Sequence, residues 1–189
     1  MRKVILFVTV LIISFSTGVY AKQDFTSYSP AFKDGDLALQ AGLGLHPAGT
    51  YGDMVVPPLF VGVDWAHSIA DLPLSFGGIF GYAHSEEKFS SFGYDWTFSY
   101  NYYIVGARAA YHADLGVKNL DSYAGLMLGY NFVSAKIEGD TFGDVSADGN
   151  YLLFGGYLGA RYFFTDNLAA FCELGFGIGI LSFGATFVL

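Results

Sequence analysis

The stretch Leu37-Ala38-Leu39-Gln40-Ala41-Gly42-Leu43-Gly44-Leu45 decides the fold. Leucine or alanine stands at every odd position, and small or polar residues stand between them. Side chains that alternate with period two project from opposite faces of a β-strand. The stretch therefore predicts a strand with one apolar face and one face of small and polar groups.

The same alternation recurs along the rest of the chain. It is found at residues 59–65, 74–83, 96–111, 124–132, 152–164, 168–176 and 181–189. Together these segments predict about eight strands of roughly 9–16 residues, and bacterial barrels have an even number of strands.

The predicted connections alternate in length. Residues 46–57, 84–95 and 134–150 form long polar connections, residues 67–72, 113–121 and Thr165–Asn167 form shorter ones, and the last, near Gly177–Gly179, is very short. Long loops at one end and short turns at the other are typical of an outer-membrane barrel whose termini both face the periplasm. We therefore expect periplasmic termini.

The N-terminal residues have the organisation of a secretory signal. Arg2 and Lys3 precede the apolar run Val4–Phe15, and small residues lead to a predicted cleavage site after Ala21. The apolar run is shorter than the roughly 20 residues that a spanning helix needs. We expect a signal peptide at 1–21, a short periplasmic segment at 22–35 and a transmembrane barrel at 36–189.

The composition agrees with an exported membrane protein. Hydrophobic residues make up 53% of the chain and charged residues 14%, whereas a soluble domain carries about 25% charge. Removing residues 1–21 takes two of the nine basic residues and none of the seventeen acidic ones, which leaves a net charge of −10 with histidine neutral. Such an acidic surface repels phosphate backbones, so nucleic acid is a poor candidate partner and we expect none.

The lone cysteine, Cys172, has no partner for an internal disulfide, and we expect it to face lipid as a small apolar residue. The chain has no Cys/His cluster with metal-ligand spacing, and we expect no metal and no cofactor.

Closure of the sheet follows from the physics of the bilayer. Every backbone N–H and C=O group must be paired in hydrocarbon, and an open sheet leaves two unpaired edges. The alternative of a single helix at Leu168–Leu189 conflicts with its four glycines. A soluble β-sandwich conflicts with the apolar outward faces. We therefore predict an all-β fold, a closed antiparallel transmembrane barrel whose narrow lumen is filled by side chains.

Four charged residues fall on the predicted inward faces: Asp64, Arg108, Arg161 and Glu173. Each lies near a periplasmic turn, so the four should meet in the lower lumen. Arg161 and Glu173 flank the turn at Thr165–Asn167 and are expected to be cross-strand neighbours. Two positive and two negative groups in a narrow lumen should pair, because an unpaired buried charge is costly. We expect a salt-bridged plug; the alternative is an ion path or gate.

Aromatic residues near the strand ends suit interfacial girdles. The candidates are Trp65, Tyr111, Tyr162 and Phe164 at one rim and Tyr82, Trp96 and Tyr130 at the other.

The C-terminal residues introduce a family resemblance. Ser182-Phe183-Gly184-Ala185-Thr186-Phe187-Val188-Leu189 resembles the signal read by the barrel assembly machinery, carried by Ser182, Gly184, Phe187 and Leu189, although the usual last residue is aromatic. Tyr157–Gly179 and Val105–His112 resemble the strand–turn–strand pattern of small outer-membrane barrels of the OmpA/OmpX/Ail type. The resemblance implies an integral barrel in the bacterial outer membrane, in contact with its lipid and with the assembly machinery.

The resemblance leaves the function open, because one barrel fold serves many roles. We expect a monomer, not an enzyme, with a structural role or a role in binding a host or other extracellular ligand through its loops. The candidate loop contacts are Tyr51, Phe89, Phe92, Tyr94 and Phe142.

Two alternatives stay open. The first is a narrow channel for ions or small hydrophobic solutes. The second is a lipid A-modifying enzyme, for which His84-Ser85-Glu86 and His67-Ser68 are the candidate residues, although the His-x-Ser spacing of such deacylases is absent. An acidic segment with Glu138, Asp140, Asp144 and Asp148 matches no calcium-binding motif.

Overall fold

The computed structural model describes residues 32–45, 52–91, 94–139 and 145–189. The predicted signal peptide, Tyr51, Phe92, Asp140, Phe142 and Asp144 lie outside the described residues. The strands are β1 (Leu37–Leu45), β2 (Asp53–Ile69), β3 (Leu72–Ser91), β4 (Tyr94–Ala113), β5 (Leu120–Gly139), β6 (Val145–Phe163), β7 (Leu168–Gly175) and β8 (Leu181–Val188). The described part of the chain contains no helix with the length and hydropathy of a membrane span.

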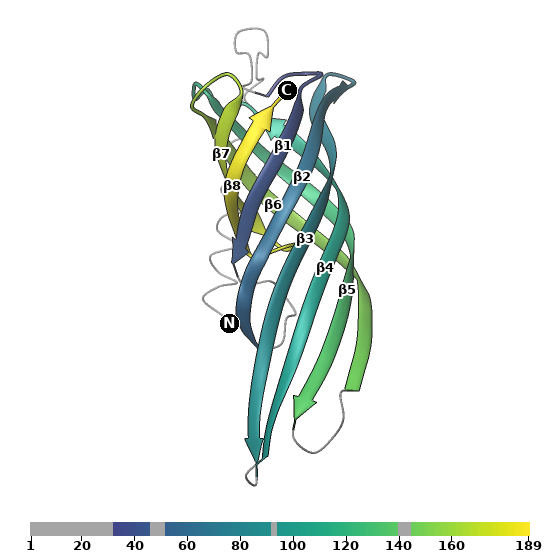
Figure 1. Cartoon of the computed structure of the whole chain (residues 1–189). Coiled ribbons are helices and arrows are strands. Elements are labelled where there is room, and N and C mark those ends of the chain that lie inside the picture. Colours follow the sequence, from purple (N-terminus) through teal and green to yellow (C-terminus); the bar gives the residue numbers. More distant parts are fainter. Residues whose placement is uncertain (1–31, 46–51, 92–93, 140–144) are drawn as a thin grey trace, which may run out of the picture.

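The eight strands form a closed antiparallel barrel in which each strand pairs with the next (Figure 1). Closure is made by β1 and β8, whose register runs from Ala38 opposite Val188 to Leu45 opposite Leu181. The predicted fold class and strand number are confirmed. At the end that carries the chain termini, β2 and β3 are joined at Ala70 and Asp71, which both have positive φ (50° and 64°), as a tight two-residue hairpin requires.

The strands differ greatly in length. β7 and β8 have 8 residues and β1 has 9, whereas β3, β4 and β5 have 20 and β6 has 19. A tilted strand crosses a bilayer with about 9–11 residues. β3 to β6 are therefore about twice as long as a crossing needs, and they project beyond the rest of the barrel (Figure 1).

The predicted long loops at 84–95 and 134–150 are therefore wrong, because β3, β4, β5 and β6 continue through most of these residues. The predicted loop at 46–57 is also too long, since β2 begins at Asp53. We call the projecting part the blade and define it as residues 84–91 of β3, 94–102 of β4, 133–139 of β5 and 145–151 of β6. Its polar residues suggested loops, but they lie on paired strands, and on β4, β5 and β6 they alternate with apolar or small residues.

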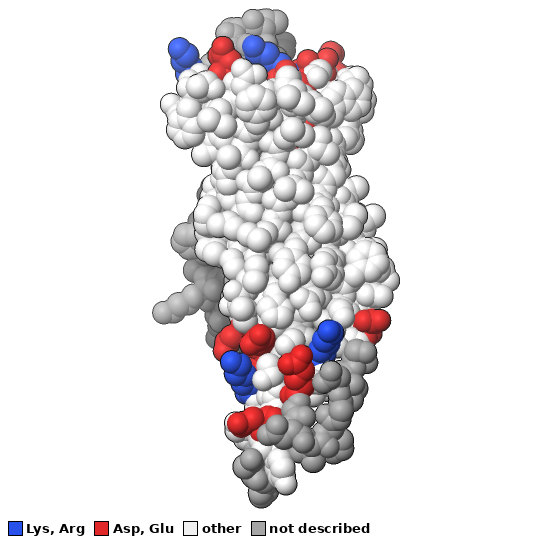
Figure 2. Space-filling view, viewed as in Figure 1, with Lys and Arg blue, Asp and Glu red and all other residues white. Residues whose placement is uncertain are grey.

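An apolar belt surrounds the barrel between the blade and the end that carries the chain termini. Outward side chains such as Val61, Val105, Leu126, Phe154 and Leu174 are 50–69% exposed. Charged side chains gather in bands at the two ends of the molecule, and the middle of the face shown carries none (Figure 2). Cys172 is exposed on this outward face. Such a wall is stable only against hydrocarbon, since water would not solvate so continuous an apolar surface.

The aromatic positions fit girdles at both rims with one exception. Trp65, Tyr111, Tyr162 and Phe164 are exposed on the outward face near the turns, and Tyr82 and Tyr130 face outward near the other rim. The prediction for Trp96 is wrong, because Trp96 lies opposite Phe89 inside the blade. Tyr103, whose ring centroid lies 5.2 Å from that of Tyr82, stands at this rim instead.

The middle of the lumen is filled by an apolar cluster of Phe60, Ile79, Ile104, Met127, Phe171 and Ile178. Ile178 comes from the short connection between β7 and β8 and is only 5% exposed, so this connection turns into the barrel.

Candidate functional site

The part of the lumen nearer the chain termini holds a charge cluster, which we define as Asp64, Arg108, Asp121, Arg161 and Glu173. They come from five different strands and are all at most 8% exposed. Period-two alternation turns these side chains inward, while their sequence neighbours face out. Four of the five are the residues that the sequence placed in the lumen, and the structure brings them together.

The pairing within the cluster differs from the expected one. Arg108 Nη2 lies 2.6 Å from Glu173 Oε1, and Arg108 Nε lies 3.2 Å from Asp64 Oδ1. Arg161 Nη2 lies 2.5 Å from Asp64 Oδ2, and Arg161 Nη1 lies 3.7 Å from Asp121 Oδ2. Asp64 therefore bridges the two guanidinium groups.

Arg161 and Glu173 are cross-strand neighbours as expected, but on the diagonal, and they do not form an ion pair with each other. Arg161 lies opposite Phe171, and Glu173 lies opposite Gly159. The turn between β6 and β7 is centred on Asp166, one residue earlier than a direct pairing would need. The two side chains are thus diagonal, and each takes its partner from another strand.

Neutral groups complete the cluster. The Tyr123 hydroxyl donates to Glu173 Oε1 over 2.8 Å, Arg108 Nε donates to the Tyr157 hydroxyl over 3.1 Å, and Gln40 donates to Asp64. The guanidinium of Arg161 lies 4.7 Å from the ring centroid of Tyr123. The Tyr123 ring occupies the space where a side chain at Gly159 would begin, so only glycine fits there.

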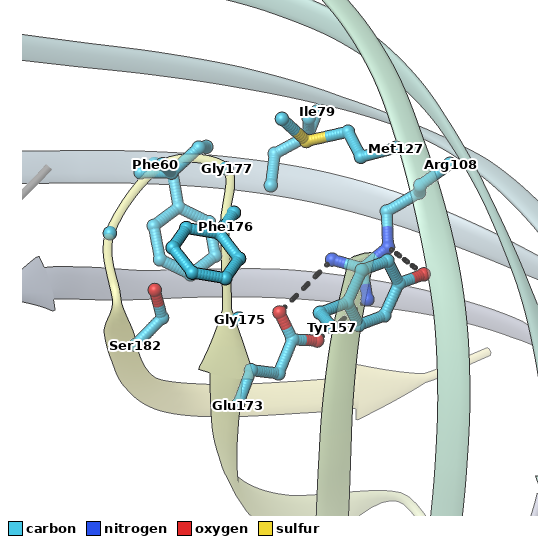
Figure 3. A pocket seen from close by; sticks show the side chains of 12 residues that line it. Phe60, Ile79, Arg108, Met127, Tyr157, Glu173, Gly175, Phe176, Gly177 and Ser182 are labelled. Atoms are coloured by element: carbon cyan, nitrogen blue, oxygen red, sulfur yellow. Dashed lines mark hydrogen bonds and ion pairs between the residues drawn. The ribbon is translucent and has the colours of Figure 1, made fainter. Parts of the chain in front are cut away.

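The polar cluster meets the apolar cluster in the middle of the lumen. Arg108, Glu173 and Tyr157 face Phe60, Ile79 and Met127 across a cavity of about 20 Å³ (Figure 3). A cavity of this size holds about one water molecule. The geometry at this level is that of a packed interior with almost no free space.

A second buried network, which sequence reasoning missed, contains His112. Its Nδ1 lies 2.7 Å from Asp121 Oδ1, and its Nε2 lies 2.8 Å from Ser75 Oγ. A tautomer that donates Nδ1–H to Asp121 accepts the Ser75 hydroxyl at Nε2, which is the order of a catalytic triad. Ser75 is only 1% exposed, however, so its hydroxyl is out of reach of a substrate. The sequence did contain a signal for this position. His112 and Arg108 are both at even positions of the same strand, so alternation places both side chains in the lumen.

Aromatic rings close this network from the side of the chain termini. Phe32, which is 3% exposed, has its ring centroid 5.2 Å from that of His112 and 5.0 Å from the Arg161 guanidinium carbon. The charges of this part of the lumen are thus shielded from the water at the end that carries the chain termini.

The residues considered for catalysis from the sequence are not brought together. His84 Nδ1 lies 3.1 Å from Asn101 Oδ1 and His84 Nε2 lies 3.5 Å from Glu86 Oε1, but Ser85 is buried on the opposite face. His67 stacks on Trp65 with 4.6 Å between ring centroids. Neither histidine reaches a serine hydroxyl in the contacts of the described residues.

In the described ranges, the side chains that could bind a metal ion are likewise not brought together. Among the described residues, no three His, Cys, Asp or Glu side chains are grouped so that they could hold a metal ion. Glu138 and Asp148 of the acidic segment are exposed on the blade.

Two candidate contact residues, Phe89 and Tyr94, lie on strands instead of loops and are 58% and 48% exposed. Both are near Trp96, with ring centroids 6.2 Å and 6.3 Å away. The remaining three candidates lie outside the described residues.

The C-terminal residues occupy both faces of β8. Ser182 is buried, and Gly184 lies against the backbone of Ala41 and Gly42. Phe187 and Leu189 are exposed, at 47% and 66%. The polar and small positions of the resemblance thus face the lumen, and the apolar positions face outward.

Comparison with known proteins identifies the fold. No family model matches the chain, and no curated protein matches it. The crystal structure of the N-terminal β-barrel domain of Pseudomonas aeruginosa OprF matches with a TM-score of 0.51 and 13% identity, over 82% of this chain and 98% of that one. The structure of Ail from Yersinia pestis, in complex with the heparin analogue sucrose octasulfate, matches with a TM-score of 0.48 and 15% identity, over 82% and 96%. The OprF match shows that this chain has the fold of the small eight-stranded barrels that the sequence resembled.

Proposed function

We propose that this chain, a barrel with the fold of the OprF domain, is an integral outer-membrane protein that closes its own lumen and interacts with ligands through its blade. The observation that carries the proposal is an inversion of side-chain polarity along the long strands. On β4 the outward positions are apolar from Tyr103 to Tyr111 and polar from Asp95 to Asn101. An outward face that changes from apolar to polar marks the boundary between lipid and water.

The inversion occurs at the same level on neighbouring strands. Tyr82 lies opposite Tyr103, and Tyr103 lies opposite Phe132, so these three form one row across β3, β4 and β5. Beyond the row, the outward positions are His84, Glu86, Lys88, Asp95, Thr97, Ser99, Asn101, Ser134, Lys136 and Glu138. We assign the row to the outer boundary of the membrane and the blade to the medium outside the cell.

The side chains inside the barrel support a lumen without a water path. Salt-bridged and hydrogen-bonded side chains fill the part nearer the chain termini, and the apolar cluster with Ile178 fills its middle. A continuous water path would need these groups to separate. The proposal therefore favours a structural and surface-interaction role over a narrow channel.

The chain ends fit the proposed orientation. β1 begins and β8 ends at the end opposite the blade (Figure 1), so an external blade places the segment 22–35 and the C-terminus in the periplasm. The C-terminal residues Ser182, Gly184, Phe187 and Leu189 would be read there by the assembly machinery. The signal at residues 1–21 would export the chain, and a monomer suffices because the barrel is closed by its own strands.

Cysteine labelling of intact cells tests the orientation. In a Cys172→Ser background, Lys88→Cys on the blade should react with a membrane-impermeant maleimide, whereas Asp166→Cys in the β6–β7 turn should react only after permeabilisation. The reverse pattern would contradict the proposal. Planar-bilayer recording tests the lumen: the purified barrel should give no stable conductance, and ohmic steps abolished by blocking the lumen would support the channel instead.

A further inference from the structure

The inner face of the blade is apolar on β4, β5 and β6, whereas on β3 it carries Ser85 and Glu87, opposite Tyr100 and Phe98. On β4 the inward positions are Tyr94, Trp96, Phe98, Tyr100 and Tyr102, in unbroken alternation with the polar outward positions. On β5 the inward positions beyond Asn131 are Val133, Ala135 and Ile137. A face exposed to water has no need of such a row of aromatic rings for folding alone, and apolar surfaces of this kind mark binding sites.

Within this face the structure forms a trough. Tyr100 and Tyr102 of β4 make one wall, and Tyr151 of β6 makes the other. The floor between them consists of small and β-branched residues from β5 and β6: Val133, Ala135, Ala147 and Gly149. The two walls are separated by two strand spacings, about 9–10 Å, and the open cavity measures about 380 Å³. A cavity of this volume has room for a single saccharide ring.

A buried amide beside the trough holds the hydroxyl group of one of its walls. Asn131 is 3% exposed, and its Nδ2 donates to the Tyr151 hydroxyl over 2.7 Å. Its Oδ1 has no hydrogen-bond partner among the described residues. Asn131 lines a smaller cavity that shares Tyr102 and Tyr151 with the trough. Asn131 Oδ1 itself is buried out of reach of a ligand. The Tyr151 hydroxyl accepts from Asn131, so its own proton is left to donate to a hydroxyl group that a ligand would bring.

The charges around the trough restrict the ligand further. The described residues of the blade include five carboxylates, Glu86, Glu87, Asp95, Glu138 and Asp148, against two lysines, Lys88 and Lys136. This balance repels sulfated, phosphorylated or sialylated molecules. The polar outer face places the trough on the water side of the membrane boundary, so its ligand is water-soluble.

We infer that the trough of Tyr100, Tyr102 and Tyr151 binds an uncharged saccharide of a glycan outside the cell. The apolar face of a sugar ring packs on the tyrosines, and the Tyr151 hydroxyl, which Asn131 holds in place, donates to a ring hydroxyl. The glycan is a foreign one, because saccharides anchored in the barrel's own membrane lie beside the outer wall, and the trough is on the inner face. This inference rests on the proposed function and names the ligand of the blade.

A glycan array tests the inference with the full mature protein in detergent. The array carries uncharged glucose-, galactose- and N-acetylglucosamine-terminated oligosaccharides beside sialylated and sulfated forms of the same chains. We expect binding to uncharged oligosaccharides and none to their charged counterparts. For the best binder, titration calorimetry should show that Tyr151→Ala and Asn131→Leu each weaken binding roughly tenfold or more, the loss expected for one well-made contact.

A matched control separates the trough from general damage. Tyr130→Ala removes an outward tyrosine next to Asn131 on the same strand and should leave the affinity unchanged. Heat-shifted gel mobility checks that each variant is folded. If Tyr151→Ala does not fold, Tyr151→Phe replaces it, because phenylalanine keeps the ring. The Tyr151→Phe protein should no longer discriminate between a sugar and its deoxy analogue.

Three results would overturn the inference. They are binding of no uncharged oligosaccharide, binding that Tyr151 and Asn131 variants leave unchanged, and trough-dependent binding of the cell's own lipopolysaccharide in preference to the oligosaccharides. The labelling of Lys88→Cys on intact cells keeps the two proposals apart. If Lys88→Cys is labelled from outside but the protein binds no glycan, only the inference is contradicted. If Lys88→Cys is not accessible from outside, the proposed function is contradicted as well.

Discussion

Replacing Arg161 with leucine removes the most deeply buried cation of the lumen. Arg161 is 0% exposed and lies between Asp64 and Asp121, with its guanidinium over the rings of Phe32 and Tyr123. The charge cluster contains three carboxylates and two guanidinium groups. Arg161→Leu leaves the three carboxylates with one arginine.

The expected cost follows from what each partner keeps. Breaking a buried ion pair by removing one member costs about 3–5 kcal/mol, because the other charge is left uncompensated. Asp64 keeps Arg108 at 3.2 Å and Asp121 keeps His112 at 2.7 Å, which limits the electrostatic loss. The lost packing of the guanidinium on two rings contributes roughly 0.5–2 kcal/mol. We expect Arg161→Leu to lower the free energy of unfolding by about 3–4 kcal/mol.

Urea unfolding of the barrel in liposomes, followed by tryptophan fluorescence, measures this loss. Lys118→Leu, at an exposed position between β4 and β5, is the matched control and should change stability by less than about 0.5 kcal/mol. Adding Asp64→Asn to Arg161→Leu should restore part of the loss, because it removes an uncompensated carboxylate. If Arg161→Leu unfolds at the same urea concentration as the control, the cluster does not hold the barrel together and the reasoning is refuted.

Three further substitutions test the pairing of β1 with β8, the apolar belt and the C-terminus. Gly184→Ala would bring a methyl group against the backbone of β1 and should cost about 1–3 kcal/mol in urea unfolding, whereas Gly149→Ala points into open space and should cost nothing. Leu126→Arg, in the belt at 58% exposure, should cost about 2–4 kcal/mol, and Thr97→Arg on the outer face of the blade should be neutral; equal effects would contradict the belt. Leu189→Asp should reduce the folded fraction in cells several-fold while leaving refolding of the purified barrel into liposomes unchanged, and equal losses in both would argue against an assembly signal.

Alternation predicted the number of strands and their faces because it is a local property of each segment. Leu37–Leu45 carries its own two faces whatever it pairs with. The same locality explains why Asp64, Arg108, Arg161 and Glu173 could be assigned to the lumen: their parity alone places them inside.

Most of the blade was missed because its alternation has the opposite phase. On β5 the apolar positions are even from Ala124 to Phe132 and odd from Val133 to Ile137. On β4 the predicted strand already began at Trp96, so residues 96–102 were included in it. A search for apolar residues on one constant face ends at the point where the phase changes, and the polar remainder resembles a loop. The change of phase is the signature of a strand that leaves the membrane and continues in water.

Contacts between distant strands could not be derived from parity. The ion pair of Arg161 with Asp64 spans 97 positions, and its geometry depends on strand register and barrel tilt. Ser75, His112 and Asp121 meet for the same reason. The turn between β6 and β7 is centred on Asp166, one residue earlier than a direct pairing would need. Arg161 and Glu173 therefore form ion pairs with residues of other strands and not with each other.

The most direct measurement of the membrane boundary is a cysteine scan along the outward face of β4. Single cysteines at Thr97, Ser99, Val105 and Ala107 in a Cys172→Ser background are exposed to a water-soluble maleimide in liposomes. The first two should react at a rate close to that of an exposed turn, the last two should be protected, and the transition should fall at Tyr103. Uniform reactivity along the strand, or protection that recurs with a helical period, would contradict a barrel whose outward face passes from lipid into water at that row.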